Sequence, residues 1–309
     1  MLIIDDTIVK SCNFMYLDDK KKRILITGAT GYLGSNIINT LKDKYEFVLL
    51  KRQNSNLKRI ECLEDFQIID IDNFDIKLVK ELDIDILLHC ATHYGRKNID
   101  SVNTIEANLL LPLHLLSLFQ KAGRSIKFIN TDTILDKHIN VYSLSKSQFK
   151  EWMLFFSDDI VFINIKLEHF YGPLDDKTKF VSYLINSFLN NDSYIDLTKG
   201  EQKRYFTYID DIVSAFDVII SKIDQFNKGL TEFHVSSDEP VNLKVFVNLV
   251  KHVTGNLTTT LNWGKIPYRN GELMDFLVDS SKIKILGWQP KVSLTDGIKK
   301  TYLLDKQHL

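Results

Sequence analysis

Short apolar runs alternate with longer stretches of helical spacing over the first half of the chain. The runs are RILIT (23–27), EFVLL (46–50), FQIID (66–70), DILLHC (85–90), IKFIN (126–130) and IVFINI (160–165). Helix-like stretches lie between them, notably 34–44, 104–123 and 143–156. Continuous apolar strands that alternate with helices predict a parallel sheet covered on both faces. The pattern therefore predicts a doubly wound α/β fold.

The pattern changes after Gly172-Pro173. We expect helices at about 177–190, 209–223 and 242–254, with short strands at 193–197, 204–208 and 232–237 between them. This predicts an arm over 1–22, a doubly wound domain over 23–172, and a smaller α+β lobe over 173–309. Some segments of that lobe are expected to return to the first sheet.

Composition narrows the class of protein. The 309 residues are 44% hydrophobic and 26% charged, as in ordinary soluble proteins, and the net charge of −1 argues against a nucleic-acid partner. We expect the basic run 20–23 to flank the first strand in solvent. Three distant cysteines without a CxxC pair argue against a disulfide framework or a metal site and favour the cytoplasm. No signal peptide or membrane span is expected.

A glycine-rich turn joins the first strand to the first helix. Gly28 permits the tight turn, Gly31 permits close approach of a pyrophosphate, and Gly34 permits close packing of helix and strand. The free N–H groups and dipole of the helix favour an anion there. The turn therefore predicts a Rossmann dinucleotide site, with Thr30, Tyr32 and Leu33 among its contacts.

The second strand ends in basic rather than acidic residues. An acid at this position usually holds the ribose 2′-hydroxyl of NAD, whereas this chain has Arg52 and Ser55. Because an arginine pairs with a 2′-phosphate that a carboxylate would repel, we expect NADP(H), with NAD(H) as the alternative. A solvated basic loop is the other interpretation. Asp70 and Ile71, after the third strand, are candidate adenine contacts.

Carbonyl reduction needs a proton donor, and a tyrosine with a lysine four residues later on a helix suits that role. This spacing occurs three times, at Tyr16/Lys20, Tyr142/Lys146 and Tyr302/Lys306. The second pair alone begins a helix after the fifth strand. Thr131 and Thr133, at the end of that strand, are candidates to hydrogen-bond the substrate oxygen, or to cap the turn.

These motifs together resemble an extended short-chain dehydrogenase/reductase, the class of nucleotide-sugar epimerases, dehydratases and 4-ketoreductases. The resemblance rests on TGATGYLG (27–34), HCAT (89–92), TDT (131–133), YSLSK (142–146) and FYGP (170–173), and it extends from Arg23 to about Gln289. It implies that Tyr142 is the acid/base, that Lys146 binds the nicotinamide ribose, and that Cys90, Ala91 and Thr92 line the cofactor. The resemblance further implies a threonine that completes the catalytic triad. Counting back from ILD, which matches the family's usual Val-Tyr-Gly, gives Thr131, whereas counting strand length gives Thr133.

The resemblance also implies a nucleotide-sugar substrate. Arg204, in GEQKRYFTYIDDI, and Arg269, in YRNGELMDFLVD, match the positions that meet the diphosphate. His169 and Lys166 replace the usual asparagine and arginine before FYGP. His93 and Arg96 are candidates for the sugar pocket, with a solvent-exposed loop as the other interpretation of His93. The family's habit further implies a homodimer through 106–119 and 143–156.

The choice among reactions depends on Asp132. Dehydratases carry Asp-Glu here, whereas Asp132 precedes Thr133, so the base is missing. Together with Arg52, this favours an NADPH-dependent reductase, and the local texture resembles CDP-sugar 4-ketoreductases of the CDP-abequose and CDP-paratose synthase type. Reduction of a CDP-4-keto-3,6-dideoxyhexose for surface polysaccharide is therefore the expectation. The alternatives are a 4-epimerase, a 4-ketoreductase of a dTDP-, GDP- or UDP-sugar, and a non-catalytic NADP-binding sensor.

Overall fold

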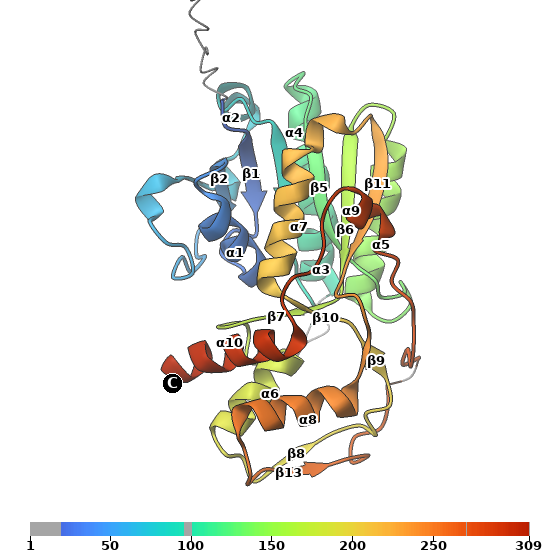
Figure 1. Ribbon diagram of the computed structural model, residues 1–309. Coiled ribbons are helices and arrows are strands. Elements are labelled where there is room, and N and C mark those ends of the chain that lie inside the picture. Colours follow the sequence, from blue (N-terminus) through green and yellow to red (C-terminus); the bar gives the residue numbers. More distant parts are fainter. Residues whose placement is uncertain (1–19, 96–100, 270, 309) are drawn as a thin grey trace, which may run out of the picture.

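A seven-stranded, fully parallel sheet organises the chain (Figure 1). The computed structural model describes residues 20–95, 101–269 and 271–308. Its strand order is β11-β6-β5-β4-β1-β2-β3. The strands are β1 (Arg23–Thr27), β2 (Glu46–Lys51), β3 (Gln67–Asp70), β4 (Ile86–His89), β5 (Lys127–Thr133), β6 (Val161–Leu167) and β11 (Gly229–Val235). The doubly wound fold predicted from the apolar runs is confirmed.

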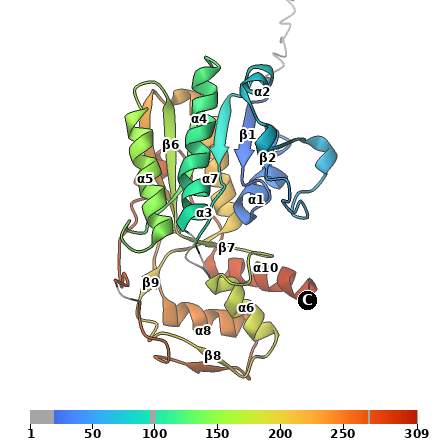
Figure 2. The ribbon, with the colours of Figure 1, turned by 180° about the vertical axis from the view of Figure 1, so that it is seen from behind.

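Helices cover both faces of the sheet (Figures 1 and 2). Ile24 and Ile26 of β1 pack on the side of α1 (Tyr32–Leu41) and α7 (Ile209–Ser221). Leu25 between them packs on the side of α2 (Ile76–Glu81), α4 (Leu111–Lys121) and α5 (Val141–Phe155). This alternation explains the continuous apolar runs of strands such as β1 and β4. Short 3-10 turns cover Leu63–Asp65, Ile71–Asn73 and Ile223–Gln225.

One continuous helical stretch precedes β5. It comprises α3 (Ser101–Ile105), a π-helical segment (Glu106–Leu110) and α4. By length and composition alone, Ser101–Lys121 is apolar enough to cross a membrane. Leu115, Leu116 and Phe119 are buried in the core beside α2 and the sheet, and 39% of the apolar window is buried within the fold.

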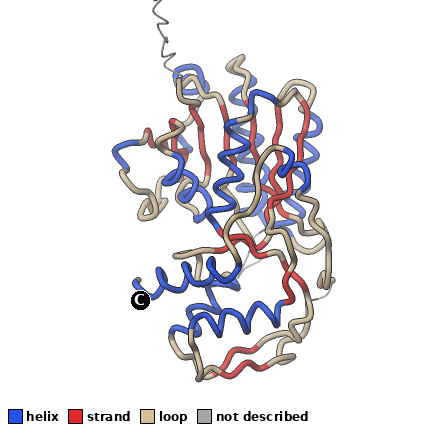
Figure 3. The backbone as a smooth tube through the Cα atoms, viewed as in Figure 1, coloured by secondary structure: helices blue, strands red, loops and turns tan. Residues whose placement is uncertain are grey.

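A second group of elements lies beyond the carboxyl ends of the sheet strands (Figures 1 and 3). Its helices are α6 (Phe180–Leu189), α8 (Leu243–Thr254) and α10 (Leu294–Gln307). Its strands form three pairs: β7 (His169–Tyr171) with β10 (Phe206–Tyr208), β9 (Lys203–Arg204) with β12 (Val241–Asn242), and β8 (Tyr194–Asp196) with β13 (Thr260–Asn262). The apolar core continues from α1 and α7 into α6 and α8.

Segments of the second half of the chain also contact the main sheet. Strand β11 pairs with β6, α7 covers the sheet, and α9 (Ser281–Ile285) packs on β11. The domain boundaries at 22 and 172 stay predictions. Most of the predicted arm lies outside the described residues.

The basic run before β1 lies among acidic side chains. Lys20 is paired with Asp83, Lys22 with Asp224, and Arg23 with Glu46. The run therefore flanks the first strand, and these three members form ion pairs with acids of neighbouring segments.

Candidate functional site

The predicted site lies where the order of the sheet reverses. From the neighbours β1 and β4, the chain builds outward in opposite directions, to β3 on one side and β11 on the other. Ligands of open α/β sheets bind outside the carboxyl ends of the strands at such a point. The segments that follow β1, β4 and β5 meet there.

The glycine turn has the geometry that a bound diphosphate needs. Gly28 has φ +70°, and a Cβ there would lie 2.4 Å from the Ala91 nitrogen. A Cβ on Gly34 would lie 2.3 Å from the Gly28 oxygen, whereas one on Gly31 would meet only that oxygen, at 3.2 Å. The space beside Gly31 is thus open. Helix α1 begins there with no acid in its first turn and no side-chain cap, so its N–H groups fit an anion.

A chain of polar contacts connects β1 with α5 across β4 and β5. The Thr27 hydroxyl lies 2.8 Å from Nδ1 of His89, and the Thr131 hydroxyl donates to the His89 carbonyl at 3.0 Å. The Lys146 ammonium donates to the Thr131 carbonyl at 2.8 Å. These bonds place the predicted lysine and threonine beside the end of β4.

Burial controls the charges in this chain of contacts. It lowers the pKa of Lys146 to about 8, although Asp132 and Cys90 act in the opposite direction. Burial, and then the charge of Lys146, hold the pKa of His89 well below its usual range, so this ring is neutral near pH 7. Burial raises the pKa of the Cys90 thiol to about 12.

The start of α5 fixes Tyr142 and Lys146 on one face. The Asn140 side chain accepts from the Ser143 N–H at 2.8 Å in a capping box, which anchors the first turn. Tyr142 is half-buried, with its ring centroid 5.1 Å from that of Tyr94 after β4. Lys146 follows one turn later and is 1% exposed. The structure thus brings the predicted pair to the sheet edge.

The two candidate threonines have different surroundings. Thr131 is 6% exposed and lies between β4 and α5 through the contacts above. The hydroxyl of Thr133 accepts from the Leu135 N–H at 3.2 Å and so caps the following turn. Which threonine acts on substrate stays a prediction.

His93 belongs to a buried scaffold. Its Nδ1 lies 2.8 Å from the Thr104 hydroxyl, and its main chain exchanges hydrogen bonds with the Asn108 side chain at 2.9 and 3.0 Å. Asn108, in the π-helical segment, also donates to the Ser145 hydroxyl at 2.9 Å. The ring is half-buried, unlike that of a solvated loop residue. Arg96 lies outside the described residues.

The loop after β2 presents Arg52 to solvent, with no side-chain partner among the described residues. Its neighbour Ser55 donates its N–H to the Arg52 carbonyl at 3.0 Å. Asp70 is paired with Lys51, so the acid that ends β3 is already neutralised. Ile71 begins a 3-10 turn.

A second arginine of this loop was missed from the sequence. Arg59 lies 5.8 Å from the ring centroid of Tyr32 and donates to the Leu174 carbonyl at 3.0 Å. Tyr32 stacks on Phe170, with centroids 6.2 Å apart. Because Arg59 and Leu174 are 115 positions apart, no local pattern signals their contact.

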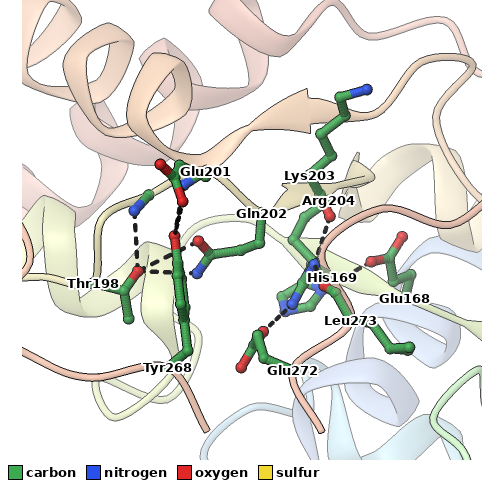
Figure 4. Close-up of polar contacts among 11 residues, drawn as sticks. Glu168, His169, Thr198, Glu201, Gln202, Lys203, Arg204, Tyr268, Glu272 and Leu273 are labelled. Carbon is green, nitrogen blue, oxygen red and sulfur yellow. Dashed lines mark hydrogen bonds and ion pairs between the residues drawn. The ribbon is translucent and has the colours of Figure 1, made fainter.

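Arg204 and Arg269 both contact Glu272; Figure 4 shows the contacts of Arg204. Arg204 is paired with Glu272 and donates to the Leu273 carbonyl at 2.7 Å. The Glu272 N–H donates to the Arg269 carbonyl at 3.0 Å, and the Arg269 side chain is exposed. Sequence reasoning did not find Glu272, which neutralises the predicted diphosphate arginine.

His169 lies close to this turn (Figure 4). Its Nδ1 lies 3.3 Å from a carboxylate oxygen of Glu168, whose other oxygen accepts from the Tyr205 N–H at 3.1 Å. The predicted substrate residues His169 and Arg204 thus come from β7 and β9, two strands of different pairs, and each has an acidic neighbour.

Known proteins match the chain over most of its length. The model of the NAD dependent epimerase/dehydratase family matches residues 24–231. A CDP-abequose synthase from Salmonella muenchen is 32% identical over 292 residues, which cover 91% of this chain and 97% of that protein. The human dTDP-D-glucose 4,6-dehydratase is 28% identical over 317 residues, 91% of this chain and 89% of that one.

Solved structures share the fold. The UDP-glucuronic acid 4-epimerase of Bacillus cereus, in complex with UDP-glucuronic acid and NAD, superimposes with a TM-score of 0.78 at 22% identity. The match covers 93% of this chain and all of that one. The chain belongs to the NAD dependent epimerase/dehydratase family, and it is an NAD(P)-dependent enzyme of nucleotide-sugar chemistry.

Proposed function

We propose that the enzyme reduces the 4-keto group of a nucleotide-linked deoxysugar with NADPH, the substrate being a CDP-4-keto-3,6-dideoxyhexose destined for surface polysaccharide. The relatives named CDP-abequose synthase, matched over nearly their whole length, support the substrate class. The observation that carries the choice of reaction is the engagement of Asp132.

Asp132 is unsuited to protonate a leaving hydroxyl. One carboxylate oxygen accepts from the Thr133 N–H at 2.7 Å and the other from the Asn164 amide at 2.7 Å. Both oxygens are therefore engaged as acceptors by groups of the protein itself. Thr133 stands where a dehydratase has its base. The chain therefore has neither a suitable acid for the leaving hydroxyl nor a base to take the proton at these two positions.

The remaining groups suit carbonyl reduction. A bound reduced nicotinamide supplies the hydride that the C4 carbon receives. Tyr142 donates its phenolic proton to the C4 oxygen as negative charge develops there. The neighbouring Lys146 ammonium favours the departure of that proton and holds ribose hydroxyls. Thr131 orients the C4 oxygen by a hydrogen bond that replaces its bond to the His89 carbonyl.

Arg52 supports NADPH as the reductant, with NAD(H) as the alternative. Its guanidinium is exposed after β2, and the acid nearest in the sheet, Asp70, is held by Lys51. An unpaired guanidinium at this place pairs with a 2′-phosphate in a bidentate manner. Arg59 adds a second positive charge to the same loop.

Arg204 and Arg269 are proposed to bind the diphosphate of the substrate, with His169 and the half-buried His93 near the sugar. Arg204 must exchange its Glu272 carboxylate for phosphate oxygens when substrate binds. Arg96 belongs to this proposal from the sequence alone.

We also propose a homodimer in the cytoplasm. Leu144, Trp152 and Phe155 on α5 are 41%, 42% and 74% exposed, which is unusual for large apolar side chains on one helix. Pairing of α5 with its copy would cover them. Sedimentation equilibrium of wild type and Phe155→Glu tests this, since a monomeric wild type refutes it.

The substrate proposal is tested by a panel. NADPH is mixed with CDP-, dTDP-, GDP- and UDP-linked 4-keto sugars, and nicotinamide oxidation is followed. We expect NADPH to be oxidised fastest with the CDP-linked sugar. Interconversion of a nucleotide hexose without added cofactor, and no oxidation with any keto sugar, would instead identify an epimerase.

A further inference from the structure

A polar layer lies between α5 and the carboxyl half of the sheet, where the strands are otherwise apolar. Its members come from four elements, and those of β5 and β6 include register partners. They are Asn130 and Asp132 of β5, Asn164 and Lys166 of β6, Glu232 of β11, and Lys146 and Lys150 of α5. None of these residues is exposed.

The orientation of Asp132 is fixed from β6. Asn130 donates its amide to the Asn164 oxygen at 2.8 Å, which turns the Asn164 amino group toward Asp132. That group donates to Asp132 at 2.7 Å, and the Thr133 N–H holds the second oxygen at 2.7 Å. Asn130, Asp132 and Asn164 are all at most 6% exposed. Both oxygens of this buried carboxylate thus accept N–H groups, and among the described residues no cation is hydrogen-bonded to it.

The other acid of the layer is already neutralised. Glu232 forms ion pairs with Lys150 at 2.7 Å and with Lys166 at 3.0 Å. It also accepts a hydrogen bond from the Asn164 amide at 3.2 Å. Two of the three lysines are therefore used by Glu232. The third, Lys146, donates to the carbonyl of Thr131, the residue before Asp132.

We propose that Asp132 is a positioning residue: held by Asn164, its carboxylate keeps the buried Lys146 in the ammonium form. The second half of the inference, that this charge serves Tyr142, rests on the proposed function. The first half concerns the chain alone.

The bond from Lys146 to the Thr131 carbonyl brings the ammonium to the peptide unit that precedes Asp132. His89 and Cys90 come from β4 and its end, and Tyr142 lies one turn before Lys146 on α5. The His89 ring is neutral because its pKa is held far below the usual range, and the Cys90 thiol, with its pKa raised to about 12, is protonated. Burial lowers the pKa of Lys146 to about 8, and Asp132 is the first of the groups that act in the opposite direction.

The test reads the ionisation of Lys146 in the free protein. Lysine is labelled with carbon-13 at Cε, the Lys146 signal is assigned with Lys146→Arg, and its pKa is measured by NMR in wild type and Asp132→Asn. A nearby opposite charge shifts a pKa by roughly 1–3 units, so we expect the Lys146 pKa to fall by about one unit or more when the Asp132 charge is removed. An unchanged or higher pKa overturns the proposal.

Glu232→Gln is the matched control, because it removes the same charge from the same layer but does not face Lys146. Its Lys146 pKa should stay within about 0.3 units of wild type, well below the shift expected at short range. A fall as large as that of Asp132→Asn would make the effect general to the layer and overturn the assignment. If Asp132→Asn does not fold, the same measurement is made on Asp132→Ser, which removes the same charge and has a smaller side chain. Loss of the fold in both makes Asp132 a structural residue and also overturns it.

A second readout joins the inference to turnover. In Asp132→Asn, the basic limb of the rate profile should move to lower pH by the shift that NMR measures. The NMR result stands whether or not any sugar is reduced. A shifted Lys146 pKa without turnover of any keto sugar therefore refutes the proposed function alone.

Discussion

Single residues at the sheet edge have properties that follow from burial. Lys146 is 1% exposed, so its proton is held more weakly than in water, and its pKa is lowered to about 8. The spacing of Tyr142 and Lys146 was readable from the sequence because a helix places such residues on one face. The bond from Lys146 to the Thr131 carbonyl was not, since it depends on how α5 packs on β5.

Tyr142→Phe removes the proposed proton donor. Loss of general acid catalysis usually costs about 10²–10⁴-fold, so turnover should fall by that factor while NADPH affinity changes less than about threefold. Steady-state rates and fluorescence titration with NADPH measure the two effects. Tyr302→Phe is the control, because Tyr302 has the same spacing to Lys306 on α10 yet lies elsewhere. A Tyr142→Phe enzyme with near-normal turnover would remove Tyr142 from this role.

Arg52→Asp tests the cofactor preference. Loss of a charge-assisted pair with the 2′-phosphate costs about 1.5–3 kcal/mol, so the Kd for NADPH should rise at least tenfold while that for NADH changes little. Calorimetric titration gives both constants. Lys80→Asp, an exposed charge reversal on α2, should leave them unchanged. If Arg52→Asp retains the wild-type preference, the basic loop is merely solvated.

Whole elements show where pattern reasoning works. The first six sheet strands, β1 to β6, were found from their apolar runs. Strand β11 was expected only as a short strand at 232–237 of the second lobe, because it is polar in part and half-buried over most of its length. Helix α10 was absent from the predicted elements, since only four of its residues are buried, Gly297, Ile298, Thr301 and Asp305, and its apolar stripe is thin. The pairing of Arg204 with Glu272 joins residues 68 positions apart and depends on the path of the chain after β13. No helical or strand periodicity encodes it.

Two glycines of the turn between β1 and α1 are expected to have different roles, Gly34 in packing and Gly31 in cofactor binding. Gly34→Ala forces a Cβ to 2.3 Å from the Gly28 oxygen, and such overpacking costs about 1–3 kcal/mol. Gly31→Ala meets only that oxygen, at 3.2 Å, and projects into otherwise open space. We expect Gly34→Ala to lower stability to urea, and Gly31→Ala to lower NADPH affinity with a smaller loss of stability. The reverse ranking would contradict this assignment of the two glycines.

The contact of β11 with α5 and β6 should respond to acid. Although burial opposes it, hydrogen bonds from Lys150, Lys166 and Asn164 bring the pKa of Glu232 from 4.5 to about 2. Because folding lowers the pKa of Glu232, this carboxylate stabilises the fold at pH values above its pKa in the unfolded chain. The stabilisation is lost as pH falls from about 5 toward 2. Glu232→Gln should therefore cost about 1–2 kcal/mol at pH 7 and progressively less below pH 5, measured by urea unfolding. A cost that does not change with pH would mean the pair is not ionic.

At the scale of the molecule, the fold brings the predicted cofactor residues and the predicted substrate residues to the same edge of the sheet. The glycine turn, the ends of β4 and β5, and the start of α5 meet at the reversal of strand order, and the elements that carry Arg204 and Arg269 lie beyond the same edge (Figure 1). This arrangement follows from topology, so family membership predicts it. Which sugar enters depends on side chains of distant segments, such as Glu272, and the sequence pattern did not reveal them.

The central claim is net hydride transfer from NADPH to C4 of the keto sugar. Its most direct test uses NADPH deuterated at the transferred position of the nicotinamide, the CDP-4-keto-3,6-dideoxyhexose, and mass spectrometry with NMR of the product. The account predicts one deuterium at C4 for each NADP formed. Product without deuterium, or a nucleotide sugar interconverted with no NADPH consumed, would contradict it.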